Sequence, residues 1–218
     1  MRGDDESSSD AIVYVVDDDP SVRRGLERLL RSVGLAVETF STACAFLEAA
    51  PADQPGCLVL DVVLPGCSGL ELQSTLSKTE RALPIVFITG QGSVTRSVEA
   101  MKAGAVDFLQ KPVDDNQLLE SVDRAIELSR RLRAERTERM DIRRRRAALT
   151  PREREVMDLL VAGKINRLIA AELGNAEKTV KIQRRRVMDK MRVRSVAELV
   201  WLAGKAGLNH DAVGRAVR

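Results

Sequence analysis

Polar residues able to support chemistry recur at the ends of short apolar runs in the first half of the chain. Each run is bounded by turn or polar residues, which is typical of a strand buried on both faces. The polar residues at or just past the ends of four such runs are Asp17 and Asp18, Asp61, Thr89 and Lys111. Three carboxylates, a hydroxyl and an ammonium group could together bind a divalent cation and stabilise a phosphoryl group.

The sequence between these runs predicts the fold that would bring them together. Apolar residues from Val22 to Val33 recur at helical spacing, and Gly34 ends that helix. A further strand is expected at Leu35–Phe40, and helices are expected near 41–49, 70–77 and 94–103. Five strands alternating with helices predict an α/β domain with a parallel, doubly wound sheet. In the strand order 2-1-3-4-5, the ends that carry the polar residues meet at one edge.

The clustering of three carboxylates predicts a cation site. Carboxylate oxygens with open water positions favour Mg²⁺, and Lys111 can offset the remaining negative charge. In such a site Asp61, at the end of the run that begins at Cys57, can attack phosphorus and form an acyl phosphate. The competing interpretation is a set of unrelated turn aspartates and a surface lysine. Because these polar residues fall at the ends of four different strands, the pattern favours the cation site.

Composition restricts the class of protein. The chain has 218 residues, of which 44% are hydrophobic, and this favours two ordinary domains. No apolar run is long enough to cross a bilayer, and the acidic, Ser-rich start at 1–10 does not resemble a signal peptide. We therefore expect a cytoplasmic protein without a membrane partner. Three cysteines are too few for a disulfide framework and do not match a zinc site, and the role of Cys67 stays open.

The charge is divided unevenly along the chain. Up to Pro112, 10 Lys and Arg residues stand against 16 Asp and Glu, for a net charge of −6; the remainder has 25 against 16, for a net charge of +9. The basic second half predicts contact with a polyanion. Because that half lacks interleaved aromatic residues, we expect duplex DNA rather than single strands or RNA.

Beyond Asp114 the sequence predicts one long helix. No Pro or Gly occurs between Val113 and Pro151, and an apolar stripe from Leu118 to Ile126 gives way to sequence rich in Arg and Glu. We expect the far end to be too polar to join a core. The four consecutive arginines at 143–146 are expected to act either as a solvated hinge or as DNA or phosphate contacts.

Four shorter helices are expected after this linker. Thr150, Pro151 and Glu153 provide a cap, a first helical position and a capping box for the first of them. The others are expected over 165–173, 177–191 and 195–206. A short helix, a tight turn at Gly174 and a longer basic helix form a helix-turn-helix arrangement.

The longer basic helix has two different faces. Val180, Val187 and Met191 share the face expected to lie inward. The opposite face can enter a major groove, where Lys181 and Arg185 can reach guanine edges. The residues expected to contact DNA are Lys178, Thr179, Lys181, Ile182, Arg184 and Arg185. The competing interpretation, a solvated basic face, is weakened by the helix-turn-helix setting.

Residues from about Ile12 to Leu128 resemble the receiver domain of two-component response regulators, which has a flavodoxin-like fold. The resemblance is carried by Asp17-Asp18, Asp61 within LVLDVVLPGCSG, Thr89 and Lys111-Pro112. It implies that Asp61 is the phosphoacceptor and that a sensor histidine kinase is the donor. It also implies Mg²⁺ held by Asp18, Asp61 and the backbone carbonyl of Val63, with Asp17 acting mainly through water.

The same resemblance implies a cis bond between Lys111 and Pro112, and a switch in which Phe108 moves as Thr89 turns toward the phosphoryl group. Phosphatases of the haloacid dehalogenase type carry a second acid where this chain has Val63, so a turnover phosphatase is disfavoured and we expect no enzyme. The only histidine, His210, lies far along the chain. The phosphoryl donor must therefore be another molecule.

From Leu149 to about Leu208 the chain resembles the LuxR/FixJ-type four-helix DNA-binding domain, in LTPREREVMDLLVAGKINRLIAAELG and EKTVKIQRRRVMDKM. Gln183 stands where these domains usually carry His, and we expect it to find a backbone partner. The whole chain thus resembles response regulators of the FixJ/NarL class. That class implies a dimer, formed on phosphorylation, that binds promoter DNA, with RNA polymerase as a further partner. The alternative is a phosphorylation-independent DNA-binding protein whose receiver serves only assembly.

These patterns predict a definite organisation of the chain. The expected parts are a disordered N-terminus at 1–10, a receiver domain at 11–128, a helical linker at 129–148, a helix-turn-helix domain at 149–208 and a tail at 209–218.

Overall fold

The structure, a computed structural model, describes residues 11–49, 54–78, 83–90 and 94–208, apart from the side chains of residues 94–96. The chain divides into two compact units, residues 1–134 and 135–218, and each is considered by itself. The expected disordered N-terminus, the expected tail and His210 lie outside the described residues.

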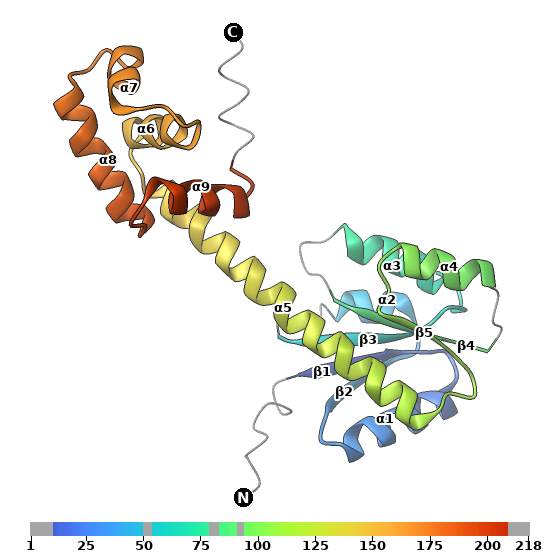
Figure 1. Cartoon of the computed structure of the whole chain (residues 1–218). Coiled ribbons are helices and arrows are strands. Elements are labelled where there is room, and N and C mark those ends of the chain that lie inside the picture. Colours follow the sequence, from blue (N-terminus) through green and yellow to red (C-terminus); the bar gives the residue numbers. More distant parts are fainter. Residues whose placement is uncertain (1–10, 50–53, 79–82, 91–93, 209–218) are drawn as a thin grey trace, which may run out of the picture. The chain divides into compact units, whose positions relative to one another are not determined.

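The first unit is built on a five-stranded parallel sheet (Figure 1). Its strands are β1 (Ile12–Val16), β2 (Ala36–Phe40), β3 (Gly56–Asp61), β4 (Ile85–Thr89) and β5 (Asp107–Gln110). They lie in the order β2-β1-β3-β4-β5, which confirms the predicted order. Every residue of β1, β3 and β4 is buried, as expected for strands covered on both faces.

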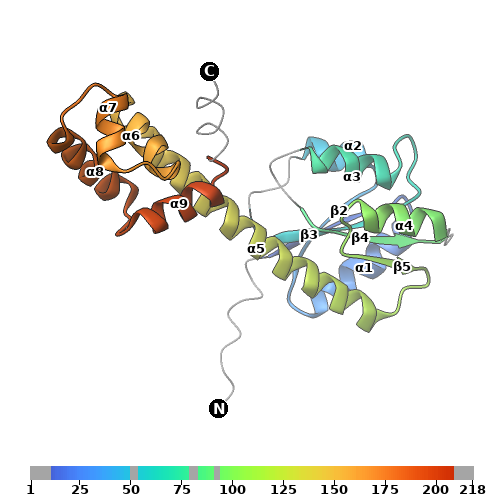
Figure 2. The same cartoon turned by 45° about the horizontal axis from the view of Figure 1, so that its top comes forward.

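Helices cover both faces of this sheet (Figure 1 and Figure 2). One face packs against α1 (Pro20–Ser32) and the first half of α5 (Asp115–Ala147), through Leu26, Leu30, Leu118 and Val122. The other face packs against α2 (Ala43–Glu48), α3 (Gly69–Ser77) and α4 (Val94–Lys102). Two apolar cores thus hold the sheet between them, and its carboxyl edge is left for polar side chains.

Helix α5 belongs to both units, and this corrects the expectation that its far end is too polar for a core. The helix runs from Asp115 to Ala147 without interruption. Ile142 near its end is only 1% exposed and packs in the core of the second unit with Val156 and Leu199. Ile142 therefore anchors this end of the helix in an apolar core, although most of the residues around it are charged.

Two of the four consecutive arginines have such partners. Arg145 bonds to Asp141 and donates to the backbone carbonyl of Met191 at 3.2 Å, and Arg146 pairs with Asp158 at 3.3 Å. Arg143 and Arg144 are exposed. A purely solvated hinge is therefore wrong for Arg145 and Arg146, which hold α5 within the second unit, and contact of the four arginines with DNA or phosphate stays a prediction.

The rest of the second unit is helical, as predicted. Its helices are α6 (Pro151–Val161), α7 (Asn166–Glu172), α8 (Glu177–Met191) and α9 (Val196–Lys205). Thr150 caps α6 and forms the predicted capping box with Glu153. No helix in the described part of the chain is long and apolar enough to cross a membrane.

Candidate functional site

The carboxyl edge of the sheet gathers the acidic residues singled out in the sequence. Asp17, Asp18 and Asp61 each offer a carboxylate oxygen, and these oxygens lie within 4.8 Å of one another. Lys111, just after β5, bridges the set: its Nζ lies 2.6 Å from Asp17 Oδ2 and 2.5 Å from Asp61 Oδ2. Residues separated by up to 94 positions in the sequence therefore form one cluster.

The turn after β1 gives its three aspartates different roles. Asp17 is fully buried, and its Oδ1 accepts from the backbone N–H of Asp19 at 2.9 Å. Asp18 is exposed. Asp19 caps α1 by accepting from the N–H of Ser21 at 2.7 Å. Arg23 on the first turn of α1 donates to the Asp17 carbonyl at 2.6 Å and so ties the helix to the site.

Burial and ion pairing act in opposite directions on this cluster. Burial raises the pKa of Asp17, although the hydrogen bond from Lys111 works against the rise. Burial also disfavours the charged form of Lys111, but its hydrogen bonds to Asp17 and Asp61 outweigh that effect and raise the pKa of this lysine. The ammonium group therefore stays charged at neutral pH, where it can balance negative charge.

Asp61 is held in a fixed position at the end of β3. Its side chain is 7% exposed, and Oδ1 accepts from the backbone N–H of Val63 at 2.9 Å. The start of α3 lies directly behind it, because a Cβ on Gly69 would stand 2.4 Å from the Asp61 carbonyl oxygen. The carboxylate is thus fixed by the packing of two elements, and this accounts for a glycine at the first position of α3.

The three carboxylates fit a magnesium ion. Their oxygens are hard donors that already converge, and Asp18 is exposed to water while Asp17 and Asp61 are buried. Val63, the other predicted ligand, lies beside the cluster through its N–H contact to Asp61. The donor set is therefore suited to Mg²⁺ from the protein side.

The predicted switch residues lie on the two strands next to β3. Thr89 ends β4 and is fully buried, and its carbonyl accepts from the N–H of Lys111 at 2.8 Å. Phe108 on β5 is half-buried, with its ring 6.2 Å from that of Phe87 on β4. The implied cis peptide between Lys111 and Pro112 is present.

Cys67, whose role stayed open, lies half-buried in the turn after β3. Burial raises the pKa of its thiol, which disfavours the reactive thiolate form. The structure therefore favours a packing role for this cysteine.

The second candidate site is the outer face of α8. Val180, Val187 and Met191 are buried, which confirms the predicted inner face. Among the predicted DNA contacts, one group shares the exposed face: Lys178, Thr179, Lys181, Ile182 and Arg185. Ile182 is 49% exposed, so an apolar side chain lies open to solvent among basic ones. Such a face can both attract phosphates and touch a thymine methyl group.

Two residues of α8 depart from the expectations. Arg184 is half-buried and donates to Asn166 Oδ1 at 3.3 Å, so the guanidinium also fastens α8 to α7. Gln183 Oε1 is buried without a hydrogen-bond partner within the described residues, so the expected backbone partner for this oxygen is wrong.

Comparison with protein families identifies both units. Residues 13–123 match the response regulator receiver domain, and residues 147–203 match the luxR family of bacterial regulatory proteins. The chain belongs to the LuxR-type response regulators. It is therefore a transcription regulator with a receiver domain and a LuxR-type DNA-binding domain, and the predicted family is confirmed.

Several known proteins are similar over nearly their whole length. Nodulation protein W of Bradyrhizobium diazoefficiens is 47% identical, over 95% of this chain and 91% of that protein. The transcriptional regulatory protein FixJ of the same species is 43% identical, over 91% of this chain and 97% of that protein. The solved response regulator StyR superimposes with a TM-score of 0.77 at 46% identity, over 90% of this chain and 99% of that one.

Sequence reasoning missed several residues that shape the receiver site of this response regulator. Arg23 acts through the Asp17 carbonyl, which no motif records, and Gly69 was quoted only as the last residue of the motif around Asp61, without a role. Asp107, at the start of β5, was assigned no role from the sequence, but its carboxylate contacts Ser121 and Arg124 of α5. A glycine directly after a capping serine was the one available signal, because a good helix former would be expected there.

Proposed function

We propose that this response regulator accepts a phosphoryl group on Asp61 from a sensor histidine kinase, and that the phosphorylated form binds promoter DNA as a dimer in the cytoplasm. The observation that carries the proposal is the placement of Lys111 Nζ within 2.6 Å of both Asp17 and Asp61. The ammonium group of Lys111 lies between two carboxylates, so it can exchange one of these hydrogen bonds for one to an incoming phosphoryl oxygen.

The proposed transfer needs little rearrangement of the protein. An oxygen of Asp61 forms a bond to phosphorus while the bond between phosphorus and the imidazole nitrogen of the donor breaks, and the imidazole leaves. Lys111 balances charge on the phosphoryl oxygens, and the N–H of Val63 keeps the carboxylate in line. Asp17, Asp18, Asp61 and the Val63 carbonyl would hold Mg²⁺, which supplies further charge neutralisation at those oxygens.

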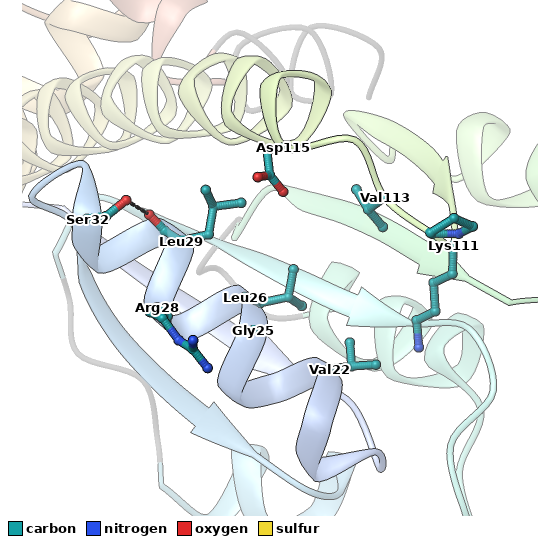
Figure 3. Close-up of a pocket in the computed structure, with 10 residues that line it drawn as sticks. Val22, Gly25, Leu26, Arg28, Leu29, Ser32, Lys111, Val113 and Asp115 are labelled. Carbon is teal, nitrogen blue, oxygen red and sulfur yellow. Dashed lines mark hydrogen bonds between the residues drawn. The ribbon is translucent and has the colours of Figure 1, made fainter.

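A groove beside the site offers a place for the kinase. It has a volume of about 590 Å³ and lies between α1 and the start of α5 (Figure 3). Val22, Leu26, Leu29 and Val113 provide apolar lining, and Lys111 stands at one end. A helix of the kinase that buried its apolar face here would bring its phosphohistidine toward Asp61.

This docking can be tested separately from the chemistry. Leu29→Arg should reduce transfer from the kinase by at least about tenfold, because it puts a charge into the apolar lining. Transfer from acetyl phosphate should be unchanged. Leu47→Arg on α2, where the leucine is 40% exposed, is the matched control. Equal kinase transfer in both variants would place the docking surface elsewhere.

The proposed output runs through Thr89, Phe108 and a dimer. Phosphorylation draws Thr89 toward the new group, Phe108 rotates, and the surface of α4 and β5 changes shape. Val98 and Met101 on α4 are 44% and 46% exposed, so this surface has apolar side chains for a second copy. Dimerisation would place two α8 helices on two half-sites of a promoter.

The deciding experiment measures labelling and DNA binding together. With acetyl phosphate and Mg²⁺, the native protein should be phosphorylated and Asp61→Asn should not. Removing Lys181 and Arg185 together by alanine substitution should weaken specific binding by about 2 kcal/mol or more. A double variant of two exposed α1 arginines, Arg24→Ala with Arg31→Ala, changes the net charge equally and should bind DNA normally.

Two results would overturn the proposal. Labelling of Asp61→Asn at the native level would exclude Asp61 as the phosphoacceptor. If beryllofluoride changes neither the oligomeric mass nor the DNA affinity of the native protein, the phosphorylation-independent alternative is favoured.

A further inference from the structure

Strand β5 presents different chemistry on its two faces. Phe108 points into the core shared with α2, α3 and α4, next to Phe87. Asp107 and Leu109, on either side of it in sequence, point to the opposite face, where Leu109 packs with Leu118 and Val122 of α5. One strand thus links the ring of the proposed switch to the helix that continues into the second unit.

The Asp107 carboxylate contacts that helix directly. Its Oδ2 accepts from Ser121 Oγ at 2.6 Å and from Arg124 Nη2 at 2.5 Å, and both donors lie on α5. Its Oδ1 accepts from the N–H of Phe108 at 2.8 Å. Arg124 also donates to Ser121 Oγ at 3.1 Å, so the three side chains form a closed network.

The two donors differ in their surroundings. Ser121 is 1% exposed and the Asp107 side chain is 29% exposed, so their hydrogen bond is partly shielded from water. The Arg124 side chain is 56% exposed, and its ion pair is screened by solvent. The bond between Asp107 and Ser121 is therefore the stronger positional constraint, and Arg124 helps to orient the carboxylate.

The other end of β5 is joined to the phosphorylation site. The N–H of Lys111, directly after the strand, donates to the carbonyl of Thr89 at 2.8 Å. Because β5 is only four residues long, we expect a displacement at Thr89 and Lys111 to extend along the strand to Asp107. The network on α5 is the polar contact that receives this displacement.

We propose that Asp107 is a positioning residue that transmits the phosphorylation state from β5 to α5 through Ser121 and Arg124. The inference rests on the proposed control of DNA binding by phosphorylation. The face of β5 opposite Phe108 thereby transmits the phosphorylation state to α5, which the aromatic switch alone does not do. Leu109 maintains the packing of β5 on α5, and the carboxylate fixes the register between them.

The direct test measures amide hydrogen exchange in α5 over residues 117–126, with and without beryllofluoride. In the native protein, beryllofluoride should change exchange in β5 and in this part of α5. In Asp107→Ala, the change should remain in β5 and disappear from α5. Ser121→Ala should reduce it, and Asp107→Asn, which keeps an acceptor, should retain part of it.

Controls separate transmission from loss of fold. Glu27→Ala removes a different ion pair of the same unit, the one with Arg31 on α1, and should leave the exchange response intact. Labelling of Asp61 by acetyl phosphate should be normal in Asp107→Ala, since Asp107 lies outside the acidic cluster. The ratio of DNA affinities with and without beryllofluoride should fall by about tenfold in this variant.

The hydrogen-exchange results test this inference separately from the proposed function. If exchange in α5 responds to beryllofluoride equally in Asp107→Ala and in the native protein, Asp107 does not transmit. If α5 of the native protein shows no response at all, the inference also fails, whatever DNA binding shows. Loss of labelling or of phosphorylation-dependent DNA binding in the native protein would instead refute the proposed function.

Discussion

The close approach of α3 to β3 makes Gly69 a sensitive test of how Asp61 is held. An alanine Cβ at this position would stand 2.4 Å from the Asp61 carbonyl oxygen, 3.1 Å from Phe87 Cε1 and 3.2 Å from Leu60 Cγ. Since non-bonded atoms settle at about 3.5 Å, α3 must move away from β3 by about 1 Å. Overpacking of this kind costs about 2 kcal/mol.

Gly25 in the middle of α1 is the matched control. A Cβ added there meets no atom within 4 Å, and the backbone of neither glycine is in the left-handed region. Gly25→Ala should therefore stabilise the receiver unit by about 0.5–1 kcal/mol, because alanine loses less conformational entropy in a helix. The two alanine variants should differ by about 3 kcal/mol in free energy of unfolding.

Urea denaturation can resolve this difference within one chain. The only tryptophan, Trp201, lies in α9 of the second unit and reports that unit, whereas far-UV circular dichroism reports both. Gly69→Ala should shift the circular dichroism transition and leave the tryptophan transition unchanged. It should also slow phosphorylation of Asp61 by about tenfold, because the carboxylate is displaced. Equal stability of the two alanine variants would refute the close-contact explanation.

Three further predictions concern the second unit and use the tryptophan signal. Ile142→Ala should lower the free energy of unfolding by about 2–5 kcal/mol, because it opens a cavity where α5 enters the core. Met140→Ala, at a side chain 48% exposed, should lower it little. Similar losses in the two variants would mean that α5 ends outside this core. The hydrogen bond from Lys190 lowers the pKa of Glu153 below its ordinary 4.5, so the stability it provides is present above that value and is lost as the pH falls through the lowered pKa. Glu153→Gln should flatten that acid dependence of urea denaturation, and an unchanged profile would contradict the assignment. Gln183→Met should be neutral or stabilise by about 1 kcal/mol, because it removes a buried oxygen without a partner among the described residues; a clear loss of stability would show that the oxygen is satisfied.

Local patterns in the sequence were sufficient for the elements, whereas the order of the sheet was taken from known doubly wound folds. Alternation of apolar runs with helical periodicity predicts a parallel sheet, and parallel strands bring their carboxyl ends to one edge. Asp17, Asp61 and Lys111 could therefore be assigned to one cluster before any distance was known. The bounds of α8, from Glu177 to Met191, were predicted to the residue, because turn residues precede the helix and its apolar positions keep helical spacing.

Contacts between distant residues were decided only by the tertiary structure. The carboxylate of Asp107 reaches Ser121 and Arg124, and Arg145 reaches the end of α8, 46 residues away. A sequence shows that such groups are charged or polar but not which of them meet, because that depends on helix packing and on the register of α5 against the sheet.

By itself, then, the sequence determined the chemistry at the edge of the sheet, because residue type and strand period are both local properties. Only the tertiary structure decided how that chemistry is supported. Lys111 bridges two acids, and the missing side chain of Gly69 leaves room for the Asp61 carbonyl. Ile142 packs in the core of the second unit. The physical reason is that packing distances of a few ångströms, unlike periodicity, arise from the whole fold.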